Sequence, residues 1–147
     1  PPYEILSGLV GSEMCIRDSD IGAPRFCVDD PVHIGGPVDG NRGFVLHSQD
    51  HMLPDSMAVT HEIGLTASID MLRDITEGVG PMHTIVSLGC AGWSAGQLDR
   101  EMAENAWLSL PASAQLVFDH DHKTLWEHGF ATLGIDPGFF AGNAGTA

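Results

Sequence analysis

The run Thr84-Ile85-Val86-Ser87-Leu88 is the feature that most limits what this chain can fold into. Nearly all of its residues are apolar or β-branched. Such a run is typical of a central strand that is covered on both faces of its sheet. The sequence therefore predicts a sheet with other elements packed on each side of this segment.

Further strands and helices follow from short apolar runs and from helix-boundary residues on either side of this run. We expect strands at 26–34, 43–47, 57–61, 84–90 and 115–119. We expect helices at 68–77, 94–108 and 122–133, with Gly78 and Gly134 ending the first and third, and with Ser94 and Gln97 as a capping box that begins the second. This mixed order predicts a single α+β (mixed α/β) domain with about three flanking helices.

The first nineteen residues look foreign to the rest of the chain. Residues 3–19, YEILSGLVGSEMCIRDS, have no helical or strand period that continues into the residues after them. They resemble the string that results when sequencing-adapter DNA is translated. We therefore expect residues 1–19 to be a non-native scar and 20–147 to be the domain. A genuine N-terminal tail is the alternative.

The charge of the chain argues against one class of function. Twenty acidic and six basic residues give a net charge of −14, and without residues 1–19 the balance is 17 acidic and 5 basic, a net −12. A free-standing nucleic-acid binder needs a basic patch, which this composition does not offer. No apolar run approaches the roughly 18 residues of a membrane helix. The three cysteines lack the spacing of a disulfide or zinc framework, so a reducing cytoplasm fits best.

Two loops are candidate binding sites. Gly35-Gly36-Pro37 with Arg42 could form a backbone concavity for an anion, or equally a tight turn between strands. At the second loop, Trp93 precedes an expected helix N-terminus that includes Ser94 and Gln97, where a small anion could sit. Packing of Trp93 against the core is the favoured alternative. The candidate ligand or partner residues are Gly35, Gly36, Pro37, Arg42, Trp93, Ser94 and Gln97.

The histidines and cysteines are only weak candidates for metal binding or nucleophilic catalysis. On an extended segment His120 and His122 would point to the same side, and His128 follows, but exposed polar residues explain the pattern better than a zinc site. Cys90 lacks an identifiable base and is expected to be a small core residue. Because no complete catalytic motif is present, we assign no catalytic residue, no metal and no cofactor.

Three stretches together resemble the YqgE/AlgH family of bacterial proteins. They are PVHIGGPVDGNRGFVLH (31–47), SLGCAGWSAGQLDREMAENAWLSLPA (87–112) and LGIDPGFFAGNAG (133–145). The resemblance implies an α/β fold with a branched or pseudo-barrel sheet and a native N-terminal part that is missing here. This chain departs from the family pattern at Asn143, where the family usually has His, and at Asp99, where it tends to have Glu.

The family carries a label of transcriptional regulator, yet these motifs imply no DNA contact. The remaining basic residues, Arg25, Arg42, Arg73, Arg100 and Lys123, are scattered singly. We therefore expect a non-enzymatic cytoplasmic binding or regulatory module that acts through a protein partner or small ligand. A metal-assisted enzyme using His120 and His122 is the alternative, and a direct DNA-binding regulator is the least favoured.

Overall fold

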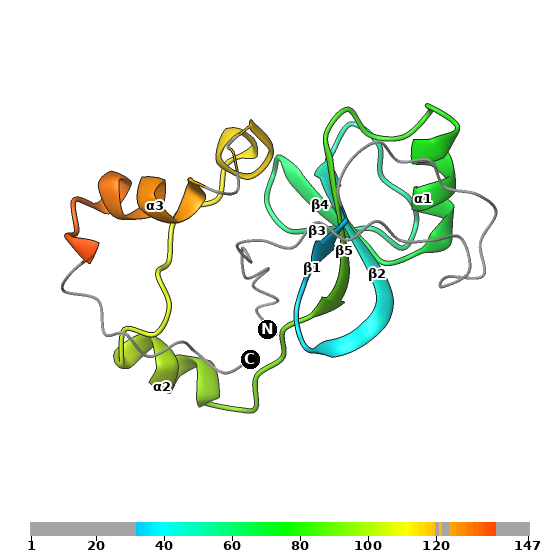
Figure 1. The fold of residues 1–147 in the computed structure, drawn as a ribbon. Helices are drawn as coiled ribbons and strands as arrows, with labels where there is room; N and C mark the ends of the chain where they lie inside the picture. Colours follow the sequence, from blue (N-terminus) through cyan, green and yellow to red (C-terminus); the bar gives the residue numbers. More distant parts are fainter. Residues whose placement is uncertain (1–31, 120, 122–123, 138–147) are drawn as a thin grey trace.

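The computed structural model describes residues 32–119, 121 and 124–137. The elements, in chain order, are β1 (His33–Ile34), β2 (Val38–Ser48), β3 (Met57–Ala58), β4 (Ile63–Thr66), α1 (Ile69–Thr76), β5 (Thr84–Cys90), α2 (Gln97–Ala103), the π-helical turn η1 (Gln115–Asp119) and α3 (Leu125–Leu133). The strands form one open sheet in the order β1-β5-β2-β4-β3 (Figure 1). The expected α+β class is confirmed.

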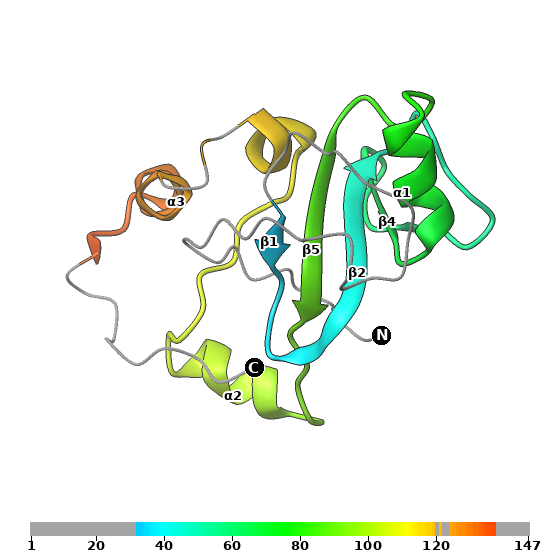
Figure 2. The same cartoon turned by 45° about the vertical axis from the view of Figure 1, so that its right-hand side comes forward.

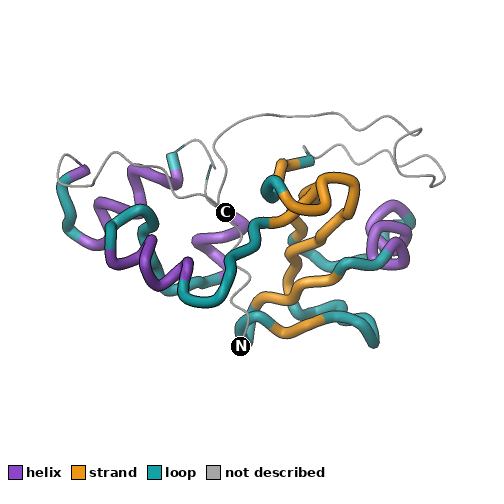
Figure 3. Tube along the Cα trace, turned by 90° about the horizontal axis from the view of Figure 1, so that it is seen from below, coloured by secondary structure: helices purple, strands orange, loops and turns teal. Residues whose placement is uncertain are grey.

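The pairing within the sheet is mixed. β1 runs parallel to β5, whereas β2 is antiparallel to both β5 and β4, and β3 is antiparallel to β4. The predicted strand at 84–90 is confirmed as β5, between β1 and β2. Seen end-on, α1 lies on one side of the strands and the other helical segments lie on the opposite side (Figure 3).

Alternation along β2 gives each face of the sheet its own core. Phe44 and Leu46 point to one face, where they pack with Ile63 and Leu65 of β4 and are covered by η1. Val45 points to the other face, where it packs with Val86 of β5 and with Met71 and Leu72 of α1. The chain therefore covers the middle of its sheet on both faces, as the β-branched run predicts.

The other predicted strands need correction. The strand expected at 43–47 begins at Val38, and the one expected at 57–61 ends at Ala58. β4 was missed because it is only four residues long and includes Gly64. Glycine is needed there, since a Cβ would lie 2.7 Å from a ring carbon of His47. Of the strand expected at 26–34, only residues 32–34 fall within the described part of the chain, and His33–Ile34 form β1.

The strand predicted at 115–119 is wrong, because these residues form η1. The Ser113 hydroxyl accepts a hydrogen bond from the Leu116 N–H at 3.1 Å, and the Ser113 carbonyl accepts one from the Val117 N–H at 3.1 Å. The resulting turn brings Val117 and Phe118 together against one face of the sheet. β-Branched and aromatic composition favours a strand, but the serine bonds and this packing select a turn.

The helices are shorter than predicted. α1 begins after Ser68, and Gly78, in the left-handed conformation, follows it as expected. The helix predicted at 94–108 covers only Gln97–Ala103, and its N-cap residue is Gly96 rather than Ser94. α3 ends at Leu133, followed as predicted by Gly134 in the left-handed conformation, and it buries Gly129 and Phe130 and leaves Trp126 exposed.

A directional chain of hydrogen bonds joins β2, β4 and the loop after β2. His47 has no exposed surface and Thr66 has 1%. The Leu53 N–H donates to the Ser56 hydroxyl at 2.8 Å, Ser56 donates to Thr66 at 2.6 Å, and Thr66 donates to His47 Nε2 at 2.8 Å. His47 Nδ1–H donates to the Ser48 carbonyl at 2.9 Å. In a neutral His47 ring, the Ser48 carbonyl requires the proton on Nδ1, so Nε2 accepts from Thr66 and Thr66 in turn accepts from Ser56.

We predict that Thr66→Val lowers the free energy of unfolding by about 1–3 kcal/mol, because it leaves the buried His47 Nε2 and the half-buried Ser56 hydroxyl without this partner. Chemical denaturation measures the change. The matched control is Thr132→Val, which removes an exposed hydroxyl from α3 and is expected to change stability by about 0.5 kcal/mol or less. Equal effects of the two substitutions would refute the role of the buried chain.

The turn after β2 is tied to the segment before β5 by Asp50. Its carboxylate accepts hydrogen bonds from the Ser48 hydroxyl and from the Met82 N–H, the latter at 3.0 Å. These bonds, chiefly the one from Ser48, hold the pKa of Asp50 below its usual value of 3.8, with a smaller contribution from the nearby His83. A carboxyl with a lowered folded-state pKa stabilises the fold above its usual pKa, and that stability is lost as the pH falls through the folded value.

Asp50→Asn is therefore expected to lower stability at neutral pH and to have progressively less effect as the pH falls from 3.8, where the unfolded chain binds a proton, through the lower pKa of the folded carboxyl. Denaturation midpoints measured from pH 7 down to acid test this. Asp55→Asn, an exposed change in the same loop, serves as the control. A stability deficit of Asp50→Asn that stays constant over the whole pH range would contradict the prediction.

Candidate functional site

The candidate loops of the sequence meet because two glycine-containing segments cross in direct backbone contact. A Cβ on Gly35 would lie 2.2 Å from the Gly89 carbonyl oxygen, too close for any side chain. A Cβ on Gly36 would lie 2.3 Å from the carbonyl oxygen of Cys90. Gly89 has a φ of +73°, and a Cβ there would lie 2.6 Å from the Gly36 oxygen. Side chains are therefore excluded from both segments at the crossing.

The crossing continues as an irregular pairing of β2 with β5. Val38 pairs with Cys90, but the next pair is Gly43 with Leu88, so residues 39–42 bulge opposite Gly89. A Cβ on Gly92 would lie 3.6 Å from a methyl carbon of Val38. The segment after β1 and the segment after β5 thus lie together at one end of the sheet, from which the chain continues into α2 (Figure 2).

Beyond this end, two tryptophans share one carboxylate. Trp93 Nε1–H donates to Glu101 Oε2 at 3.2 Å, and Trp107 Nε1–H donates to the same oxygen at 2.5 Å. The two rings meet edge to face, with centroids 5.7 Å apart and planes at 77°. All three side chains are half-buried. The carboxylate therefore fixes the angle between the two indoles.

The same carboxylate connects to the start of α2. Gln97 Nε2–H donates to Glu101 Oε1 at 3.0 Å. The Gln97 side-chain oxygen accepts the Ser94 N–H at 3.0 Å and the Ser94 hydroxyl at 3.1 Å. Gln97 thus makes the return contact of a capping box, although Ser94 does not cap the helix. We call Trp93, Ser94, Gln97, Glu101 and Trp107 the indole cluster.

Six of the seven residues selected from the sequence fall into two neighbouring groups, and the seventh, Arg42, lies in β2. Trp93, Ser94 and Gln97 belong to the indole cluster, whereas Gly35, Gly36 and Pro37 follow β1 at the crossing. The Gly35 N–H already donates to the Leu88 carbonyl at 2.7 Å. The Arg42 guanidinium carbon lies 5.2 Å from the centroid of the Phe44 ring, a cation–π contact with its own strand.

Glu101 and Trp107 were missed as site residues. The sequence carries one signal for them, because Gln97 and Glu101 stand four positions apart on a helix, a spacing that places side chains on one face. Trp107 lies beyond the end of α2, where helical spacing gives no guidance. Both residues fall within the helix expected at 94–108, which gives neither of them a separate role.

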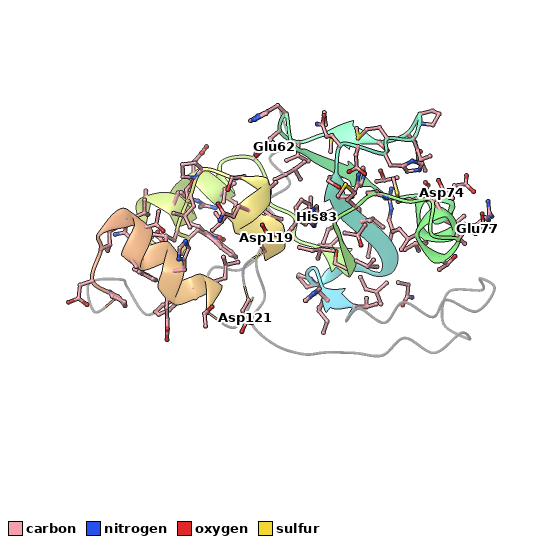
Figure 4. The ribbon with its side chains drawn as sticks, turned by 90° about the horizontal axis from the view of Figure 1, so that it is seen from above. Glu62, Asp74, Glu77, His83, Asp119 and Asp121 are labelled. Carbon is pink, nitrogen blue, oxygen red and sulfur yellow. The ribbon has the colours of Figure 1, made fainter. Side chains whose placement is uncertain are left out.

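Outside the candidate site, acidic and histidine side chains hold η1 and α1 against the sheet. Figure 4 labels Glu62, His83 and Asp119 near this junction. Glu62 accepts the Ala114 N–H at 3.1 Å, and the His83 ring stacks on Phe118 with centroids 5.7 Å apart. On the other side of the sheet, His51 bonds Asp74 of α1 at 2.8 Å. These contacts position secondary structure.

Within the described ranges, no group of three or more His, Cys, Asp or Glu side chains is arranged to hold a metal ion. His120 and His122 lie outside those ranges, as do residues 1–31 and Asn143. No helix among the described residues is long and apolar enough to span a membrane.

The geometry defines an α+β protein with an open mixed sheet, and comparison with known proteins identifies the family. The AlgH-like family matches residues 7–138. The chain is 47% identical over 121 residues to a UPF0301 protein of Chelativorans sp. (strain BNC1), covering 82% of this chain and 60% of the relative. It is 48% identical over 122 residues to a UPF0301 protein of Rhodospirillum rubrum, covering 83% and 64%. The chain belongs to the AlgH-like family, which confirms the resemblance.

A solved structure agrees with this assignment. The solution structure of the AlgH protein from Pseudomonas aeruginosa is 36% identical and matches with a TM-score of 0.66, over 85% of this chain and 66% of that one. The chain spans about three fifths to two thirds of the length of the curated relatives named above.

Glu101→Gln is predicted to destabilise the protein by about 1–2 kcal/mol, because the indole N–H bonds lose a charged acceptor. Denaturation curves measure the stability, and tryptophan emission reports the loosened indole pair. Trp126 is exposed on α3, so a Trp126→Phe background leaves only the cluster tryptophans to emit.

The matched control is Glu104→Gln, which removes an exposed carboxylate at the end of the same helix. It should leave both the stability and the emission close to those of the background protein. If Glu101→Gln behaves like this control, the carboxylate does not organise the two indoles.

Proposed function

We propose that this protein is a non-enzymatic binding or regulatory module whose ligand or partner docks at the end of the sheet formed by the glycine crossing and the indole cluster. The observation that carries the proposal is the meeting of two chain segments, 35–38 and 89–94, next to two half-buried tryptophans. Aromatic side chains that keep part of their surface exposed are common anchors in binding sites.

The rigidity of the cluster supports the proposal. The indole rings are held at a fixed angle by Glu101 and gain further support from Gln97. Side chains held in this way lose little conformational entropy when a ligand binds. An ordered aromatic surface beside a loop crossing is therefore better suited to recognition than a mobile one.

The proposal extends to the location and to the kind of partner. We place the protein in the bacterial cytoplasm, in line with the lack of disulfide spacing in the sequence and with its bacterial relatives. The partner is a protein or small ligand rather than nucleic acid, because a net charge of −14 repels a phosphate backbone at long range.

Comparative capture tests the proposal. The wild-type chain and three variants are immobilised and exposed to bacterial extract, and the retained proteins and small molecules are quantified by mass spectrometry. Trp93→Ala and Gln97→Ala alter the indole cluster, and Glu104→Gln is the exposed control.

The expected result is at least one component retained by the wild type and by Glu104→Gln but lost with both cluster variants. Circular dichroism of each variant checks that the fold is kept. If every retained component binds all four proteins equally, the binding function does not reside at this end of the sheet.

A further inference from the structure

We propose that the indole cluster binds an ammonium group, carried either by a small amine or by a lysine of a partner protein. This inference rests on the proposed function and adds the chemical class of the ligand. It reverses the expectation from the sequence, in which glycine-rich backbone and a helix N-terminus favoured an anion.

The hydrogen-bond donors of the region argue against an anion. Both indole N–H groups donate to Glu101. The Ser94 N–H and hydroxyl donate to the Gln97 side chain, and the Gln97 backbone N–H donates to the Ser94 carbonyl at 3.0 Å. At the crossing, the Gly35 N–H donates to Leu88. An anion would have to displace these internal acceptors, among them a carboxylate of its own charge.

Both indole side chains keep part of their surface exposed, which allows a ligand to reach an aromatic ring. The face of an indole is the most favourable aromatic surface for an ammonium group, because its π-electrons give it a negative potential. Trp93 and Trp107 meet at 77°, so their faces lie nearly at right angles. The Glu101 carboxylate lies at the edge of both rings and adds a negative charge next to them. Two aromatic faces and a carboxylate are the elements of an ammonium site.

The charged residues around the cluster also favour a cation over an anion. Asp99 and Glu104 are exposed on and just after α2, and Asp39 and Arg42 are both exposed in the bulge of β2. Arg100 is the one basic residue of α2. In a chain with a net charge of −14, this local excess of carboxylates raises the local concentration of cations rather than anions.

The test uses the Trp126→Phe protein and two ammonium probes, tetramethylammonium chloride and a trilysine peptide. Each is titrated to about 100 mM, enough to saturate a site with a millimolar dissociation constant. Sodium chloride at equal ionic strength and the same peptide with acetylated side chains are the matched controls, and the N-terminus of the peptide is acetylated in both forms. Tryptophan emission and the NMR signals of the two indole N–H groups report binding.

The expected result is a saturable change with at least one ammonium probe, and none with the controls. A response to tetramethylammonium assigns the site to small amines, and a response to trilysine alone assigns it to lysine side chains. Glu101→Gln and Trp107→Phe should each weaken binding about fivefold or more, while Glu77→Gln, an exposed change at the end of α1, leaves the affinity unchanged. NMR spectra of the unbound variants check that the fold persists.

The proposal is overturned if neither ammonium probe produces a saturable change, or if sodium acetate or phosphate produces one that Trp93→Phe abolishes. These failures can be separated from failure of the proposed function. If extract capture still yields a component that depends on the cluster, the binding function stands and only the ammonium class is wrong. If capture yields none and the probes do not bind, both fail.

Discussion

The backbone of Gly35 and Gly36 lies directly against that of Gly89 and Cys90, and the arrangement of the candidate site depends on this contact. The crossing lets β1 join β5 in parallel while β2 returns antiparallel on the other side of β5. It also places the chain that leaves β5 beside Val38, so that the segment with Trp93 begins next to the glycine loop. A side chain at the crossing would separate these elements.

The sheet supports this end by being covered on both faces. η1 contributes Val117 and Phe118 to one core, and α1 contributes Met71 and Leu72 to the other. The buried chain of hydrogen bonds through His47 and Thr66 adds a polar constraint that fixes the loop after β2. Hydrophobic packing gives most of the stability, whereas a fully satisfied polar chain makes one arrangement of the loop preferable to others.

Local patterns were sufficient to predict part of this fold. β5 and α1 follow from a β-branched run and from helical spacing, because each is determined by residues close in sequence. The segment 115–119 was misassigned as a strand because its composition favours one, whereas the Ser113 bonds and contact with a distant sheet face produce a turn. The α2 helix was predicted too long for a related reason, since none of its residues is buried against the rest of the described structure.

The candidate site was predictable only in pieces. The glycines at 35 and 36 stand out in the sequence, but their purpose is set by Gly89, far along the chain. Trp93, Ser94 and Gln97 were selected from the sequence, yet the carboxylate that organises them was not. Glu101 resembles any other charged residue of a solvated helix until the indole N–H groups are seen to converge on it. Such convergence is a property of three-dimensional packing.

The central claim is that the glycine crossing positions the indole cluster, and the NMR signals of the Trp93 and Trp107 indole N–H groups test it most directly. Gly36→Ala would place a Cβ on the Cys90 backbone, whereas Gly40→Ala adds one where no atom lies within 4 Å. The account predicts that Gly36→Ala shifts or broadens both indole signals in a folded protein, while Gly40→Ala leaves them unchanged. Unchanged indole signals in folded Gly36→Ala would contradict it.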